Sequence, residues 1–145
     1  MKHLLIIFSF IFLGACDFIQ TKEKKVDYCN FTGSNYIPRY IEDKDYERAK
    51  KEVPEYESIF ELWKVLSTYD GDVSSAAIYN IGLSYLKGNN DVNQDFKEAV
   101  RWIRKSNWEL GIKATLPGIR NCLLSRKMNS IKLLSLDELL EYSFQ

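Results

Sequence analysis

The sequence contains little histidine, no excess charge of either sign and no apolar run long enough to cross a membrane. Its 145 residues include one histidine, His3, and twenty basic side chains balance twenty acidic ones. This balance gives no indication of binding to nucleic acid or of attraction to anionic lipid. The apolar run from Leu4 to Leu13 is shorter than the roughly 20 residues that span a bilayer. Length and composition therefore indicate one globular domain.

The first residues, MKHLLIIFSFIFLGAC, have the pattern of a secretory signal. A short basic start precedes the apolar run, which fits the core of a signal peptide. The residues that end this segment, Leu13-Gly14-Ala15-Cys16, resemble a bacterial lipobox. In that class of signal the peptide is cut before the cysteine, whose sulfur and new amino group are then acylated. The alternatives are an uncleaved anchor, or an ordinary secreted protein with a coincidental cysteine.

The lipobox resemblance implies a signal peptide at residues 1–15 and a lipoprotein that carries acyl chains such as palmitate on Cys16. At about 0.8 kcal/mol per buried methylene, several such chains make membrane attachment effectively permanent. The folded part is then expected in the bacterial cell envelope, facing the periplasm. Asp17 resembles the signal that retains lipoproteins in the inner membrane, and it favours that membrane over the outer one.

Cleavage before Cys16 also removes His3, which leaves a mature chain without histidine. Such a chain has no Ser-His-Asp or Cys-His catalysis and no histidine-ligated metal site. The sequence also lacks a phosphate-binding glycine loop, thiol pairs at metal spacing and the ligand pattern of a calcium loop. We therefore expect no enzyme activity, no cofactor and no metal.

Two cysteines remain besides the lipidated one, Cys29 and Cys122. In an oxidising compartment they can form a disulfide, which would stabilise the fold by about 4 to 5 kcal/mol in the chain-entropy model. Alternatively, Cys122 is a small buried apolar residue and Cys29 is unpaired. The sequence leaves both interpretations open, because it does not show the geometry of the two side chains.

Residues 16–39 are expected to form the lipidated cysteine, a polar tether and an irregular arm, and residues 40–145 a helical domain. The first helical pattern begins near Ile41 and stops at Pro54. The second runs from about Glu55 to Tyr69. Its apolar residues follow the spacing of a core-facing helix; they are Tyr56, Ile59, Phe60, Leu62, Trp63 and Leu66.

The stretch from Ser74 to Gly111 contains two further helical patterns joined by a polar turn. Gly88 is placed to end the first of them in a left-handed conformation, which asparagine in the following turn also tolerates. The order of small and aromatic residues resembles the Sel1-like repeat, a relative of the tetratricopeptide repeat. The matching residues are Ala77, Ile81-Gly82, Tyr85, Gly88, Val92, Asp95, Glu98-Ala99, Trp102, Lys105 and Gly111.

A period near 40 residues extends this pattern to both sides. Trp63 precedes Trp102 by 39 residues and Gly71 precedes Gly111 by 40, as in arrays of stacked helix pairs. The predicted fold is all-α, a short right-handed solenoid of about three antiparallel helix pairs of the Sel1-like or TPR-like type.

The third pair is expected after Gly111. Pro117 should lie in the first turn of its first helix, where the missing N–H matters little. Its second helix opens at Ser135, with the spacing of a capping box and a leucine on each side for a hydrophobic staple.

Solenoids of helix pairs usually bind their partners on a concave surface. The resemblance implies that the first helix of each pair lines this surface and takes a peptide or protein. The candidate residues for such contacts are Tyr46, Lys50, Tyr79, Asn80, Leu83, Lys87, Arg120 and Asn121. Alternatively, they are ordinary surface residues.

Two classes of function follow. The first is a protein-binding module anchored in the envelope, either an immunity protein that neutralises a toxin delivered by neighbouring cells or an adaptor for envelope assembly or signalling. Sel1-like lipoproteins resemble such immunity proteins. The second is a structural envelope lipoprotein that binds cell-wall polymer.

Overall fold

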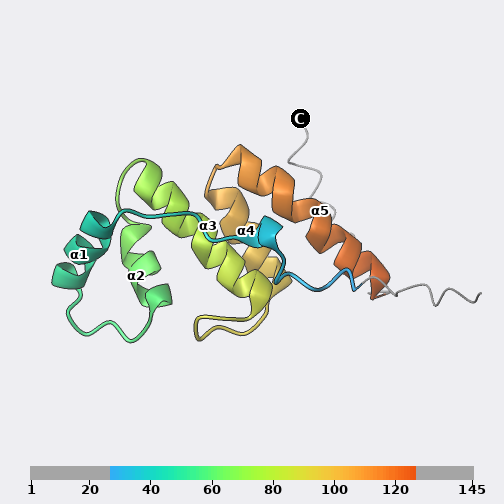
Figure 1. The fold of residues 1–145 in the computed structure, drawn as a ribbon, viewed down its shortest axis with the longest axis horizontal. Coiled ribbons are helices and arrows are strands. Elements are labelled where there is room, and N and C mark those ends of the chain that lie inside the picture. The colour runs from blue at the N-terminus through green and yellow to red at the C-terminus, as the bar shows by residue number, and fades with distance from the viewer. Residues whose placement is uncertain (1–26, 127–145) are drawn as a thin grey trace, which may run out of the picture.

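The computed structural model describes residues 27–126, whose secondary structure is entirely helical. Five α-helices and a short 3-10 helix follow one another in this part of the chain (Figure 1). They are η2 (Ser34–Tyr36), α1 (Asp43–Glu52), α2 (Ile59–Leu66), α3 (Asp72–Lys87), α4 (Phe96–Lys105) and α5 (Glu109–Ser125). No strand occurs within residues 27–126, so the predicted all-α class is confirmed there. The predicted signal peptide, Cys16, Asp17 and the helix expected from Ser135 lie outside the described residues.

Helix α3 lies between α2 and α4 and is buried on nearly every side (Figure 1). One face packs in a cluster with α4 and α5, and contributes Tyr79, Leu83 and Leu86. The opposite face packs against α1 and α2 through Ala76, Ala77 and Ile81. Because apolar side chains are buried on both faces, α3 is the centre of the hydrophobic core.

Close contact between α3 and α4 depends on Gly82. A Cβ atom at this position would lie 2.6 Å from Cγ1 of Ile103 and 2.9 Å from its backbone nitrogen. It would also lie 3.2 Å from the carbonyl oxygen of Ala99. Two of these three atoms belong to the backbone of α4, which cannot rotate away. The small residue therefore sets the distance between the two helices.

The turn between α3 and α4 has the backbone conformation expected from its sequence. Gly88 ends α3 with φ 67° and donates its N–H to the carbonyl of Ser84, as a left-handed cap does. Asn90 and Asp91 follow with φ values of 55° and 67°. Asp95 then caps α4, because its carboxylate accepts the N–H groups at the start of that helix.

Helix α2 is shorter than the pattern of its apolar residues suggests. The side chain of Ser58 accepts the N–H of Glu61, so the helix begins at Ile59 rather than near Glu55. Tyr56 consequently lies in the loop before the helix and is exposed. Placing Tyr56 and Ile59 on a core-facing stripe was wrong, since both side chains are exposed and the buried stripe begins at Phe60.

Helix α5 begins earlier than expected, and Pro117 lies in its interior rather than in its first turn. Asn107 has a positive φ of 53°, so the helical conformation is interrupted there, before Gly111. Gly111 then falls in the first turn of α5, where a Cβ atom would collide with the ring of Trp108. The expected place of Pro117 was therefore wrong. Its ring is exposed on α5, at the cost of one helical hydrogen bond.

The arm from residue 27 to residue 41 crosses the molecule from α5 to α1, over α3 (blue to cyan in Figure 1). At one end, Cys29 forms a disulfide with Cys122 of α5, which is the first of the two interpretations that the sequence left open. Phe31 is buried and packs edge-on against Tyr36. At the other end, Ile41 is buried in the cluster of α1 and α2. The arm is thus part of the core.

Candidate functional site

The surface that the sequence assigned to a partner is covered in the structure. Tyr79, Asn80 and Leu83 of α3 have only 1%, 1% and 2% of their surface exposed. Their assignment as partner-binding residues was wrong, because the arm lies against this side of α3. The ring of Tyr79 packs edge-on against that of Trp108, with 4.6 Å between the ring centres. Burial raises the pKa of the Tyr79 hydroxyl to about 12.

Asn80 holds the backbone of the arm. Its Oδ1 accepts the N–H of Arg39 at 2.6 Å, and its Nδ2 donates to the carbonyl of the same residue at 2.8 Å. These two bonds satisfy both polar backbone groups of one arm residue, which lies beside a buried helix face. Asn80, which the sequence predicted to contact a partner peptide, therefore binds a segment of its own chain.

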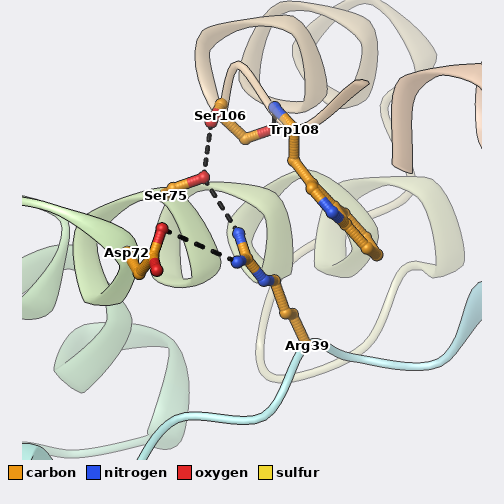
Figure 2. A network of polar contacts seen from close by, with 5 residues as sticks. All are labelled: Arg39, Asp72, Ser75, Ser106 and Trp108. Carbon is orange, nitrogen blue, oxygen red and sulfur yellow. Dashed lines mark hydrogen bonds and ion pairs between the residues drawn. The ribbon is translucent and has the colours of Figure 1, made fainter. Parts of the chain in front are cut away.

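The side chain of Arg39 extends this contact to the turn between α4 and α5 (Figure 2). Its Nη1 donates to Oγ of Ser75 at 3.0 Å, and that hydroxyl donates to the carbonyl of Ser106 at 2.6 Å. Nη2 lies 3.9 Å from Oδ1 of Asp72, and the guanidinium lies 5.1 Å from the ring centre of Trp108. The network joins the arm, α3 and the start of α5, and we interpret it as structural.

An open cleft lies at the opposite end of the molecule from α5, between α1 and α2. Its cavity has a volume of about 340 Å³. Two of the predicted partner residues, Tyr46 and Lys50, lie in its wall. The complete lining is Asp43, Tyr46, Glu47, Lys50, Tyr56, Ile59 and Leu62. Tyr56 and Ile59 remain 37% and 36% exposed although they are large and apolar.

The side chains of this cleft are held in place by their neighbours. The hydroxyl of Tyr46 accepts the indole N–H of Trp63 at 3.0 Å, and burial is the main cause that raises the pKa of this tyrosine. Nζ of Lys50 donates to Oε1 of Glu47 at 2.8 Å. This ion pair raises the pKa of the lysine and lowers that of the glutamate. The cleft therefore offers fixed aromatic and charged groups to a side chain from outside.

The remaining predicted residues do not join this cleft. Lys87 is half-buried at the end of α3, and burial lowers its pKa. Arg120 and Asn121 are exposed on α5, far from α1 (Figure 1). The eight candidates thus fall into separate groups, and Tyr46 and Lys50 share the wall of the cleft. The sequence did not identify Tyr56 and Ile59 as residues of a site, because their spacing matched that of a core-facing helix. Ser58, a capping residue type after Pro54, was the signal in the sequence that the helix begins later.

A second, smaller cavity of about 230 Å³ lies beside the first turn of α3, where the arm meets α1. It includes Arg39, Glu42, Asp45 and Asp72. The charges of Arg39 and Asp72 already face each other there, and Glu42 is paired with Lys44. Asp45 makes no ion pair within residues 27–126 and Tyr40 is 76% exposed, but this cavity is smaller than the cleft.

No protein-family model matches the chain, and neither a curated protein nor a solved structure matches it. Within residues 27–126, no helix combines the length and apolar character needed to cross a membrane. The same residues contain no cluster of three or more histidine, cysteine or carboxylate side chains arranged to hold a metal ion.

Proposed function

We propose that the chain is a membrane-anchored, periplasm-facing protein-binding module, and that the cleft between α1 and α2 is its binding site. The anchor follows from the lipobox pattern that ends at Cys16. The scaffold we propose is a Sel1-like solenoid, in which α1 with α2 and α3 with α4 are the first two pairs and α5 begins the third. We propose no enzymatic activity, cofactor or metal.

One observation carries this proposal. The arm occupies the side of α3 where a repeat protein of this kind would receive a peptide, and it stops short of the cleft at α1 and α2. The cleft keeps two large apolar side chains, Tyr56 and Ile59, partly in solvent. Tyrosine is among the residue types that contribute most to binding at protein interfaces.

The test is cross-linking from the cleft in living cells. The full chain is produced with a photoreactive phenylalanine analogue in place of Tyr56, and in a control chain in place of Leu110, which is 71% exposed on α5. Both positions are exposed, so neither change should disturb the fold. We expect a protein adduct of defined mass from position 56 and none from position 110. Equal adducts from both positions, or none from either, would refute the proposed site.

The identity of the adduct separates the roles that we propose. If the captured protein is a toxin from neighbouring cells, cells that produce this chain survive it, and cells that produce the Tyr56→Ala variant do not. A resident envelope protein in the adduct indicates an adaptor. Adducts that contain only cell-wall polymer favour the alternative, a structural envelope lipoprotein.

A further inference from the structure

The cleft between α1 and α2 combines apolar, aromatic and acidic groups around one cavity. Ile59 and Leu62 supply apolar surface, and Tyr46 and Tyr56 supply rings. Apolar surface suits the methylene chain of a long basic side chain. A ring face attracts a cation that lies within about 6 Å of its centre. These groups alone also fit an uncharged apolar side chain, so the charges decide between the two.

The charges that face the cavity leave one carboxylate without an ion pair. Glu47 is neutralised by Lys50, with 2.8 Å between Oε1 and Nζ. Asp43 makes no direct ion pair to any residue between 27 and 126, although its charge also acts on Lys50 at longer range. An unpaired carboxylate accepts a charge-assisted hydrogen bond from a guanidinium or an ammonium group, and such bonds are about twice as strong as neutral ones.

The surrounding part of the domain has the same sign of charge as Asp43. Residues 42–72 contain ten acidic and five basic side chains, whereas residues 96–126 contain two acidic and seven basic ones. The first group forms α1 and α2 and the second α4 and α5, which occupy different ends of the molecule (Figure 1). The neutral chain therefore has an acidic end. A charge distribution of this kind attracts and orients a basic partner.

We propose that the cleft receives a lysine or arginine side chain of the partner protein, with its cation against Asp43 and its methylene chain on Tyr56 and Ile59. This inference rests on the protein-binding function proposed above. It names the chemistry of the partner at the site, a basic segment that presents one long side chain to the α1–α2 end.

The experiment compares two probe peptides that differ only in charge. The full chain, purified in an uncharged detergent with isotope-labelled tyrosine rings, is titrated by NMR with acetyl-Gly-Arg-Gly-amide. The second probe carries citrulline, which has nearly the shape of arginine without its charge. We expect the ring signals of Tyr46 and Tyr56 to shift, and the arginine probe to bind about tenfold more tightly at low salt. This preference should shrink as salt is added.

A matched pair of variants locates the preference. Asp43→Asn should reduce it to less than about twofold, because the unpaired carboxylate is lost. Asp45→Asn makes the same change of charge on α1, but Asp45 lines the other cavity and its loss should leave the preference intact. Equal losses in both variants would assign the effect to the general charge of this end and overturn the proposal.

Other outcomes separate this proposal from the protein-binding function. If both probes bind equally, or neither shifts the tyrosine signals, the proposal that the cleft receives a basic side chain is wrong. A protein adduct from position 56 would still support the proposed binding site. Sedimentation at low salt checks the remaining occupant, the basic end of a second copy. Self-association that disappears in Asp43→Asn would place that end in the cleft and overturn the proposal of a separate partner.

Discussion

Replacing Gly82 with alanine is the most direct test of how this core is built. The new methyl carbon would lie 2.6 Å from Cγ1 and 2.9 Å from the backbone nitrogen of Ile103, where favourable carbon contacts need about 3.5 to 4.0 Å. Overpacking of this kind costs about 1 to 3 kcal/mol. Alanine is also a better helix former than glycine, which returns about 1 kcal/mol. We expect the free energy of unfolding to fall by up to about 2 kcal/mol, so that the variant does not gain the stability that helix propensity alone predicts.

Urea unfolding followed by circular dichroism measures this change. Gly33→Ala is the matched control, because a Cβ atom there has no atom within 4 Å and the φ of Gly33 is −66°. The control should stay within about 0.5 kcal/mol of the natural chain. A double-mutant cycle with Ile103→Ala should give a favourable coupling, because the truncated side chain makes room for the methyl group. If Gly82→Ala is instead about 1 kcal/mol more stable than the natural chain, as helix propensity alone predicts, the close contact between α3 and α4 is wrong.

Three further outcomes follow from the arm and its contacts. The disulfide between Cys29 and Cys122 joins residues with a sequence separation of 93. Cys29→Ser should therefore lower the free energy of unfolding by about 4 to 5 kcal/mol. A loss below about 1 kcal/mol, or rapid alkylation of these two cysteines in the natural chain, would contradict this. Asn80→Ala leaves the N–H and carbonyl of Arg39 without their partner at a cost of about 1 to 3 kcal/mol, and hydrogen exchange at Arg39 should become faster while exchange in α4 stays slow. Because burial raises the pKa of Tyr79 to about 12, the folded chain keeps a proton that the unfolded chain loses near pH 10. Its stability should therefore fall between about pH 10 and pH 12, and Tyr79→Phe should flatten that fall in urea titrations.

The sequence predicts most of the helices because their signals are local. The left-handed end of α3 needs a glycine, and Gly88 stands there with φ 67°. The apolar spacing within α3 and α4 identifies both helices. Gly82 contacts α4 as expected, whereas Ala77 and Ile81 pack in the cluster of α1 and α2. Errors appear where a nearby polar group overrides the spacing. The cap at Ser58 shortens α2, and the left-handed Asn107 moves the start of α5 so that Pro117 falls inside the helix.

The proposed binding site was less predictable than the helices. Tyr46 and Lys50 were expected to contact a partner, and they line the open cleft. The expectation for Tyr79 and Asn80 failed because it assumed that the inner side of α3 is free. Local spacing shows which residues share a helix face, but it does not show which other segment covers that face. The exposure of Tyr56 likewise depends on the helix boundary, which the apolar pattern alone misplaces.

What the sequence determined by itself is the helical class and the turn at Gly88. These depend on residue type and on spacings of a few residues, which act in any environment. Only the tertiary structure decided that the arm crosses α3, that Cys29 reaches Cys122 and that Asn80 binds Arg39. These contacts join residues from 41 to 93 positions apart, and their geometry exists only after the helices have packed.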